Sequence, residues 1–408
     1  MQNTKVHYFN PTCELAVANG SFSYMPPILL QEMERDLSIL PFVFGTISDI
    51  VLTENPPTEK FKNFLTGFGF ELPSFCRISD FNATFSDTID ELCPWGWSPA
   101  VHFKLKELKE RCTASFKQSP IYNWNENHQL LYERSSALNL LSDILKHWAS
   151  NYFIDQSMKG IIVTNSNEIE AFQKKHKTIV LKAPMSSSGR GIQIIRNQHL
   201  NTSNRQWISG VLKQQKYLII EPFLEKTIDL SFQFQIQDDF HINYLGNSFF
   251  ETSTTGQYKG TLIHPELNQL LPNEDPLKIN EIIQITANAI CQALKDSIYA
   301  KHYRGLLGID AILFNSSGQT LIQPCIEVNC RRNMGILTML LEDGIHSDAK
   351  GKFQLFYGST GEYLKFSEEQ LKLNPPKQIE GKFHSGFLPL VEPDLFKKFG
   401  AYINCDCR

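Results

Sequence analysis

Three oxygen-bearing side chains near the middle of an apolar stretch have the types and spacing of a metal site. Glu327 and Asn329 are two residues apart, so on an extended strand both side chains leave the same face. Asp310 lies in a preceding apolar run, and the polar cluster at 315–318 predicts a tight turn that pairs the two runs. Two carboxylates and an amide carbonyl form a hard, all-oxygen site of the kind that holds Mg²⁺. The alternative is a sheet edge whose acidic residues face water.

The spacing of these residues requires an irregularity in one strand. Around a turn at 315–318, Asp310 would pair near residue 323, which leaves Glu327 about four residues too far along. Pro324 lies between, and a proline is tolerated inside a strand where the strand bulges. We therefore predict a bulge at Pro324 that shortens the second strand.

Basic side chains near this stretch and farther upstream could meet phosphate groups. Arg331 and Arg332 follow the Glu327/Asn329 pair and could form forked hydrogen bonds with phosphate oxygens. Lys182 ends an apolar run and precedes a small flexible loop, in which backbone N–H groups could wrap an anion: Ser186, Ser187, Ser188, Gly189, Arg190 and Gly191. The loop is not followed by Gly-Lys-Ser/Thr, so it is not a Walker loop. Taken alone, it also fits a simple glycine hairpin.

Residues 217–234 contain two apolar runs that are separated by an acidic connector. Glu221, Pro222, Phe223 and Leu224 form the start of this connector. Such a hinge can offer backbone N–H and C=O groups to a purine edge and a carboxylate to ribose hydroxyls. A strand that turns a corner with exposed acidic side chains is the alternative.

Composition limits the class of protein. The 408 residues exceed one ordinary core and predict two or three domains, and 42% hydrophobic with 20% charged residues is typical of a folded soluble protein. A net charge of -4 gives the chain no excess of positive charge that would attract nucleic acid. Nine scattered cysteines favour a reducing compartment, and Cys405-Asp-Cys407 is interpreted as a frayed tail. Without an apolar signal segment or membrane span, the sequence predicts a cytoplasmic protein that binds no membrane.

The N-terminal region is expected to form a small parallel α/β unit. Its strands are predicted at 6–9, 40–44 and 50–52, with a helix opening at Pro26-Pro27. The loop at 10–20 would present a ligand site at the carboxyl end of the first strand, and the absence of Gly-x-Gly-x-x-Gly argues against a dinucleotide there. The Trp95-Gly-Trp97 cluster could line a substrate pocket or wedge an interdomain turn.

The order of these features resembles that of the ATP-grasp superfamily. A lysine with a Gly/Ser loop is followed by an acidic hinge and then by Asp310 and Glu327-x-Asn329. The resemblance covers roughly residues 130–340, and the preceding α/β unit is similar to the domain that usually precedes this fold. It implies an α/β (α+β) ATP-grasp fold: an N-terminal Rossmann-like domain at 1–125, a lid and central subdomain at 126–225, and a C-terminal antiparallel-sheet subdomain with the metal site at 226–408.

The resemblance also implies roles for particular residues. Lys182 would contact the α- or β-phosphate of ATP, and the 186–191 loop would close over the triphosphate. Glu221 to Leu224 would hold adenine, and Asp229, or failing that Glu225, would bind ribose. Asp310, Glu327 and Asn329 would hold Mg²⁺. The catalytic group would comprise Lys259 or Arg331 facing the γ-phosphate, with Arg332 beside it. A second lysine usual in the family is not evident, and Arg134 is the nearest basic substitute.

The activity that the resemblance implies is an ATP-dependent carboxylate–amine ligase. Such an enzyme forms an acyl phosphate and then an amide, releasing ADP and phosphate. Its substrates would be a small-molecule or peptide carboxylate and an amine, and a homodimer is the common arrangement for soluble enzymes. Two alternatives stay open at this point: a small-molecule kinase of the same superfamily and a non-catalytic ATP-binding sensor. Specificity is expected in the loops at 10–20 and 251–260 and in the Trp95–Trp97 cluster.

Overall fold

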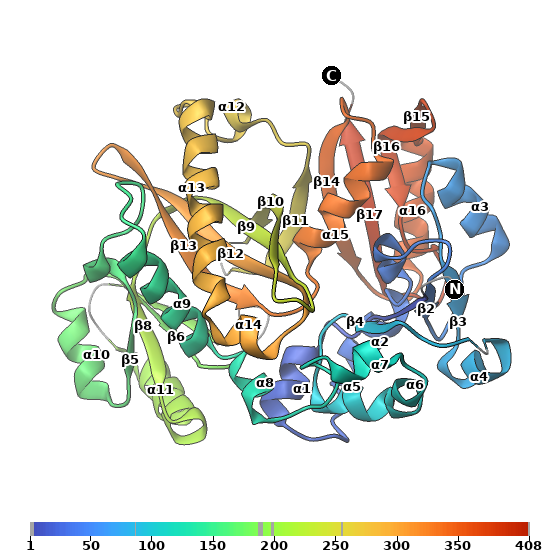
Figure 1. The fold of residues 1–408 in the computed structure, drawn as a ribbon. Coiled ribbons are helices and arrows are strands. Elements are labelled where there is room, and N and C mark those ends of the chain that lie inside the picture. Colours follow the sequence, from blue (N-terminus) through green and yellow to red (C-terminus); the bar gives the residue numbers. More distant parts are fainter. Residues whose placement is uncertain (1–3, 86, 187–190, 197–199, 254–255, 407–408) are drawn as a thin grey trace.

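The N-terminal region forms a parallel sheet with helices around it (Figure 1). The structure is a computed structural model and describes residues 4–85, 87–186, 191–196, 200–253 and 256–406. The strand order is β3-β2-β1-β4, and all three strand pairs are parallel. The strands are β1 (Lys5–Tyr8), β2 (Ile50–Leu52), β3 (Ser74–Cys76) and β4 (Glu91–Pro94). The prediction of a parallel α/β unit is confirmed.

Short helices cover this sheet. They are α1 (Cys13–Asn19), α2 (Ile28–Asp36), α3 (Glu59–Gly67), α4 (Phe81–Thr84), α5 (Pro99–Lys104), α6 (Lys106–Glu110) and α7 (Ala114–Gln118). The predicted strand at 40–44 is wrong, because Leu40–Phe44 forms a 3₁₀ helix with Pro41 in its first turn. Proline restricts φ to values that suit a helix start. Leu40, Pro41 and Phe42 are buried, as strand residues would be, so the apolar pattern alone does not distinguish the two structures.

A second, antiparallel sheet follows after α8 (Glu126–Leu130) and α9 (Arg134–His147). Its order is β5-β8-β6-β7. The elements are β5 (Ile161–Val163), α10 (Ser166–Gln173), β6 (Ile179–Lys182), β7 (Ile192–Ile195), α11 (Thr202–Gln215) and β8 (Leu218–Pro222). Helices α10 and α11 pack on it through a separate small core that includes Ile169 and Ile208. The two strands predicted around Lys182 are present as β6 and β7, and residues 187–190 between them lie outside the described residues.

The third sheet is long and antiparallel throughout. Its order among the described residues is β13-β12-β9-β10-β11-β14-β17-β16-β15. The strands are β9 (Lys226–Ile236), β10 (Ile242–Thr252), β11 (Tyr258–Ile263), β12 (Gly305–Ser316), β13 (Gln319–Asn329), β14 (Lys350–Tyr357), β15 (Lys377–Ile379), β16 (Lys382–Pro389) and β17 (Phe399–Asp406). Its helices are α12 (Leu267–Leu270), α13 (Pro276–Lys295), α14 (Ile298–His302), α15 (Met334–Leu341) and α16 (Glu362–Leu373).

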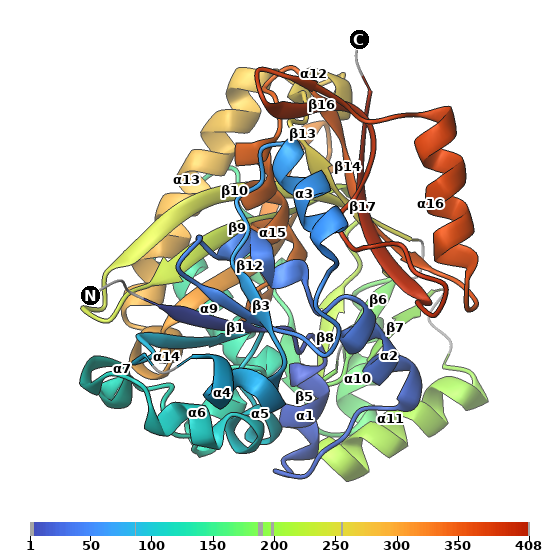
Figure 2. The same cartoon turned by 90° about the vertical axis from the view of Figure 1, so that its right-hand side faces the viewer.

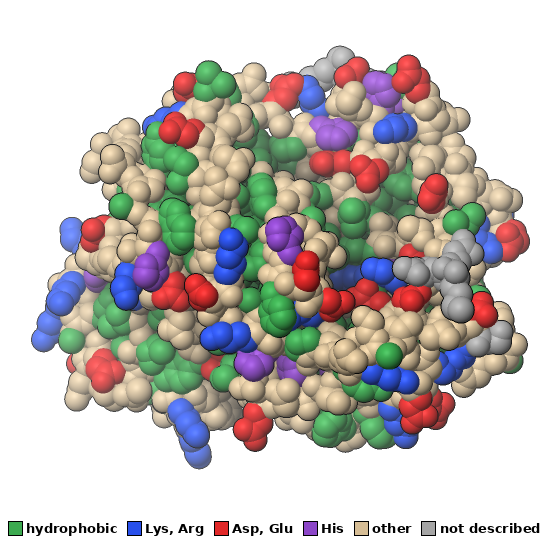
Figure 3. Space-filling model, viewed as in Figure 1, with side chains coloured by type: hydrophobic (Ala, Val, Ile, Leu, Met, Phe, Trp, Pro, Cys, Tyr) green, Lys and Arg blue, Asp and Glu red, His purple; other side chains and the backbone are tan. Residues whose placement is uncertain are grey.

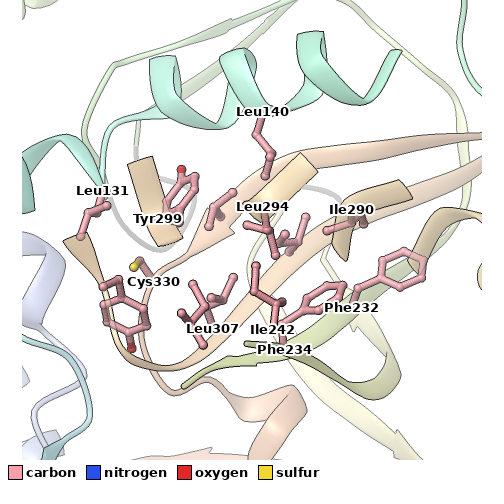
Figure 4. Packing of buried hydrophobic residues seen from close by; sticks show 14 of the residues in the cluster. Leu131, Leu140, Phe232, Phe234, Ile242, Ile290, Leu294, Tyr299, Leu307 and Cys330 are labelled. Atoms are coloured by element: carbon pink, nitrogen blue, oxygen red, sulfur yellow. The ribbon is translucent and has the colours of Figure 1, made fainter. Parts of the chain in front are cut away.

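Alternation along β9 gives this sheet one apolar and one polar face. Phe232 and Phe234 point toward α13, where Ile290 and Leu294 meet them, while Leu140 of α9 lies over the same core (Figure 4). The residues at alternate positions of β9, Asp229, Ser231 and Gln233, therefore point to the opposite face. The hydrophobic layer thus fixes β9 and β12 in place and leaves their other face to polar side chains.

The C-terminal strands extend the third sheet toward the N-terminal unit (Figure 2). Phe68, just after α3, packs edge-on against Phe383 of β16 with ring centroids 6.0 Å apart. The interpretation of Cys405 as part of a frayed tail is wrong, because it lies in β17, pairs with Gly351 and is 1% exposed. Cys407 lies outside the described residues. No helix in the described part of the chain is long and apolar enough to cross a bilayer.

A buried histidine on β1 makes stability depend on pH. His7 is 0% exposed, its Nε2 lies 3.7 Å from Asp49 Oδ2, and neither ring nitrogen has a hydrogen-bond partner among the described residues. Burial, and then the charge of Arg332, lowers the pKa of His7 to about 4. Because the folded-state pKa lies below the unfolded value of about 6.5, the stabilisation is fully present above pH 6.5 and is lost as the pH falls toward 4.

We expect unfolding by urea to report this loss. Between pH 7 and 4 the wild-type chain should lose about 3 kcal/mol more than a His7→Leu variant, because only the wild-type unfolded state gains a proton at this position. Parallel pH profiles of the two proteins would contradict the assignment.

Candidate active site

The predicted metal ligands lie together on the polar face of the third sheet. Asp310 is directly opposite Glu327 in the register of β12 and β13, and Asn329 is opposite Gly308. Asn329 Nδ2 donates a hydrogen bond to Asp310 Oδ2 at 3.0 Å. The three side chains therefore share one face, as the two-residue spacing of Glu327 and Asn329 predicted.

The predicted bulge at Pro324 is present. Ile312 pairs with Gln323, while Asp310 pairs with Glu327, so the single residue Ala311 lies opposite residues 324–326. The turn is a tight one at Ser317-Gly318, where both residues have positive φ values of 53° and 82°. The turn centre lies one residue beyond the expected position, which moves the residue opposite Asp310 from 323 to 325. The bulge adds two extra residues to the second strand and so brings Glu327 opposite Asp310.

The electrostatics of this pair favour a bound cation. Burial raises the pKa of Asp310 to about 7, and the nearby charge of Glu327 adds to the rise. The hydroxyl of Ser231, opposite Asp310 on β9, is buried without a hydrogen-bond partner among the described residues. Two facing carboxylates and an unsatisfied hydroxyl form an oxygen-donor set that a divalent cation would complete, with phosphate oxygens and water filling its remaining positions. The residues present thus fit Mg²⁺.

Arg134 connects the metal-ligand pair to the loop after Lys182. Its Nη2 donates to Glu327 Oε1 at 2.9 Å, and its Nη1 donates to Ser186 Oγ at 2.6 Å and to the carbonyl of Ala183 at 2.8 Å. The side chain is 5% exposed. A buried guanidinium held by a carboxylate and two oxygens keeps its charge and orientation. Arg134, the weakest of the sequence candidates, therefore lies at the centre of the site.

The two adjacent arginines after β13 point to different places. Arg331 donates from Nη2 to Asn329 Oδ1 at 2.9 Å and from Nε to Glu14 Oε1 at 2.8 Å, which links the cluster to α1. The guanidinium of Arg332 instead lies 4.3 Å from the ring centroid of Phe44. The structure brings Arg331 to the cluster and does not bring Arg332 there. Glu14, to which sequence reasoning assigned no role, is the partner that orients Arg331.

Trp95 and Trp97 contribute to packing. Trp95 is 2% exposed and meets Phe9 edge-on with centroids 4.9 Å apart. Its carbonyl accepts a hydrogen bond from the backbone N–H of Arg332 at 2.8 Å. Of the two sequence interpretations, the structure supports a wedge between the N-terminal unit and the third sheet.

Lys182 ends β6 and forms an ion pair with Glu221 of β8. The side chains are 6% and 15% exposed, so the pair is largely removed from solvent. Ser186 and Gly191, the two ends of the predicted phosphate loop, lie against each other. Ser187, Ser188, Gly189 and Arg190 lie outside the described residues.

The hinge residues continue from β8 toward β9. The backbone N–H of Phe223 donates to the carbonyl of Thr178 at 3.1 Å, and the guanidinium of Arg196 lies 5.1 Å from the Phe223 ring. Pro222 ends β8, and Leu224 packs at the edge of the large core.

Asp229 and Lys259 lie farther along the third sheet. Asp229 is opposite Ile312, on the same face as Asp310, and accepts hydrogen bonds from Thr252 Oγ1 at 2.9 Å and from Lys226 Nζ. Lys259 is exposed on β11, with two strands between it and β12, and no contact between Lys259 and the metal-ligand set is found in the described chain. Asp229 therefore lies near the cluster, and Lys259 is not brought to it.

The close packing of Gly191 gives a test of the loop geometry. A Cβ atom at this position would overlap the Ser186 side chain that Arg134 holds. We expect Gly191→Ala to destabilise the protein by about 1–3 kcal/mol and to weaken ATP binding. In the control Gly210→Ala, within α11, an added Cβ meets no atom within 4 Å, and a gain of about 0.5–1 kcal/mol is expected. Urea unfolding and nucleotide titration of both variants would check this, and equal behaviour would contradict it.

Comparison with known proteins gives one curated relative, and no family model matches the chain. The relative is the [butirosin acyl-carrier protein]–L-glutamate ligase of Niallia circulans, with 28% identity over 158 residues. The match covers 37% of this chain and 32% of the relative, so the chain spans about a third of the length of that protein.

Solved structures match over the whole chain. The beta-gamma-ATP complex of biotin carboxylase from Campylobacter jejuni superposes with a TM-score of 0.51 and 11% identity, covering 99% of this chain and 87% of that one. Pyruvate carboxylase from Rhizobium etli superposes with a TM-score of 0.50 and 11% identity, covering 100% of this chain and 36% of that one. At this identity, the likeness concerns the fold alone.

Proposed function

We propose that this chain, which has the ATP-grasp fold, is an ATP-dependent carboxylate–amine ligase that uses Mg²⁺. The observation that carries the proposal is the meeting of four groups on one face of the third sheet: Asp310 opposite Glu327, Asn329 bonded to Asp310, and Arg134 bonded to Glu327. These residues come from α9, β12 and β13.

Each residue has a proposed part in binding or orientation. Asp310, Glu327 and Asn329 would hold Mg²⁺, and the bound ion would neutralise negative charge on the phosphate groups. Arg331 carries a full positive charge, is fixed by Glu14 and would face the transferring phosphoryl group. Lys182 would contact the α- or β-phosphate and the hinge at 221–224 would hold adenine, with Asp229 on ribose. Lys259 and Arg332, which the structure leaves away from the cluster, have no part in this proposal.

The reaction has two balanced steps. A carboxylate oxygen attacks the γ-phosphorus of ATP, so that an acyl phosphate forms and ADP leaves. A neutral amine then attacks the acyl carbon, so that an amide forms and phosphate leaves with its electron pair, while the proton lost from the nitrogen passes to the phosphate or to solvent. In this proposal Arg134 and Arg331 would stabilise the charge that develops on the phosphoryl oxygens, and exclusion of water would protect the acyl phosphate from hydrolysis.

The curated relative indicates which substrates to test first. Its printed name contains L-glutamate and an acyl-carrier protein. We therefore propose an amino acid as the amine and a small or carrier-bound carboxylate as its partner.

The test is release of ADP and phosphate by the purified chain with Mg²⁺, ATP and pooled carboxylates and amines. Mass spectrometry of active pools should find a new amide, and hydroxylamine in place of the amine should give a hydroxamate. ADP with a stable phosphate ester would indicate a kinase instead. ATP binding without turnover across all pools would contradict the ligase and indicate a sensor.

A further inference from the structure

A cavity in the N-terminal unit lies outside the proposed ATP site. Its volume is about 710 Å³, and residues that follow β1, β2, β3 and β4 line it, among them Asn10, Thr53, Arg77 and Ser98. In the sheet order β3-β2-β1-β4, β2 and β3 are added on one side of β1, and the chain then crosses over to place β4 on the other side of β1. The loops after β1 and β4 diverge there, and such switch points at carboxyl ends of parallel strands are where α/β sheets bind ligands.

Helix α1 relates this cavity to the cluster on the third sheet. Thr12, Cys13 and Ala16 line the cavity, while Glu14 of the same helix holds Arg331. A ligand in the cavity would therefore contact the helix that orients a phosphate-facing arginine.

A carboxylate is fixed inside the cavity. Glu34 of α2 accepts hydrogen bonds at Oε1 from the backbone N–H and the hydroxyl of Thr12. Its Oε2 has no hydrogen-bond partner within the described residues. Burial raises the pKa of the Glu34 carboxyl, and the bonds from Thr12 oppose this rise. A half-buried carboxylate with one oxygen unengaged can accept a charge-assisted hydrogen bond from a cation.

Three basic residues also line the cavity, namely Arg35, Arg77 and Lys104. Lys104 is exposed and holds its ammonium 4.9 Å from the ring centroid of Tyr8. Arg77 is also exposed and donates from Nε to the backbone carbonyl of Glu54 at 2.9 Å. Arg35 contacts Asp36 at 3.3 Å. Glu54 also lines the cavity, and of the five charged residues Glu54, Arg77 and Lys104 are exposed, whereas Glu34 and Arg35 are half-buried.

Three large apolar side chains that line the cavity are exposed to solvent. Phe22, Met25 and Phe103 line the cavity and are 55%, 70% and 54% exposed. Large apolar side chains grouped at a cavity mouth are typical of ligand sites. On the face drawn in Figure 3, acidic, basic and hydrophobic side chains are interspersed.

We infer that this cavity binds the amine substrate as a primary ammonium on an apolar body, with Glu34 as its counter-ion and Phe22, Met25 and Phe103 covering its apolar part. The inference depends on the proposed function only in calling this amine a substrate. Binding of the amine to the cavity does not require ATP.

The experiment is calorimetric titration of the nucleotide-free chain with L-phenylalaninamide and phenethylamine, against the neutral isostere 2-phenylethanol. The amines should bind and the alcohol should bind at least tenfold more weakly. Glu34→Gln should reduce amine affinity by about ten- to a hundredfold, because a charge-assisted hydrogen bond is lost while the amide oxygen still accepts from Thr12. Lys104→Met should increase amine affinity, because it removes a competing positive charge. If Glu34 and Lys104 had only structural roles, their substitutions would not change amine affinity in opposite directions.

The control is Glu32→Gln, on the same helix, whose carboxylate pairs with Lys398 at 2.9 Å. It should leave amine affinity unchanged. Equal binding of amine and alcohol, or equal affinity in wild type and Glu34→Gln, would overturn the inference. ATP titration in parallel separates the two proposals: amine binding without ATP binding would contradict the ligase alone, and the reverse would contradict the amine site alone.

Discussion

Glu327→Gln is expected to reduce ATP-dependent product formation by at least about a hundredfold. Glu327 is opposite Asp310 and accepts the Nη2 hydrogen bond of Arg134. Glutamine keeps the shape and can still accept from Arg134, but it removes half of the negative charge that would hold Mg²⁺. The loss should appear in kcat and in Mg²⁺ affinity, measured by ADP release at varied Mg²⁺.

The same substitution changes two interactions of the free protein in opposite directions. It relieves the approach of two carboxylates, because the charge of Glu327 raises the pKa of Asp310, and it removes the negative charge opposite the buried guanidinium of Arg134. We expect these effects largely to cancel, so that the urea midpoint changes little while activity falls. Glu281→Gln is the matched control, because Glu281 lies on α13 and accepts from Tyr152 Oη at 3.1 Å, outside the site. Activity within threefold of wild type in Glu327→Gln would contradict its role.

Lys182→Met is expected to reduce both stability and ATP affinity. Lys182 and Glu221 form an ion pair with 6% and 15% exposure. Removing the lysine leaves Glu221 with a largely buried charge, which should cost about 3 kcal/mol in the free energy of unfolding. ATP affinity should fall at least about tenfold, because a charged contact to phosphate is lost.

The double variant Lys182→Met/Glu221→Gln separates these two effects. It removes both charges, so most of the stability should return. ATP affinity should stay low, because the phosphate contact is still absent. Urea unfolding and titration with a fluorescent ATP analogue measure the two quantities. Equal instability of single and double variants would contradict the ion-pair account, and ATP binding at the wild-type level would contradict the phosphate role.

Local sequence determined the parts of this protein that depend on strand periodicity and turn chemistry. Glu327 and Asn329 share a face because side chains alternate along β13, and Pro324 marks the bulge because a proline cannot continue the ladder of hydrogen bonds. The position of Lys182 at a strand end follows from the apolar run before it. In each case the decisive interactions lie within a few residues or across one hairpin.

Tertiary structure decided which of the charged residues meet. Arg134 contacts Glu327 across 193 residues of sequence, and Glu14 contacts Arg331 across 317. Arg331 and Arg332 are neighbours of the same type, yet β13 has ended before them and packing against Trp95 and Phe44 sets their directions. No local sequence pattern specifies these contacts, because they form only when α1, α9 and the N-terminal sheet pack against the third sheet. The cavity around Glu34 has the same origin, since four separate loops form it.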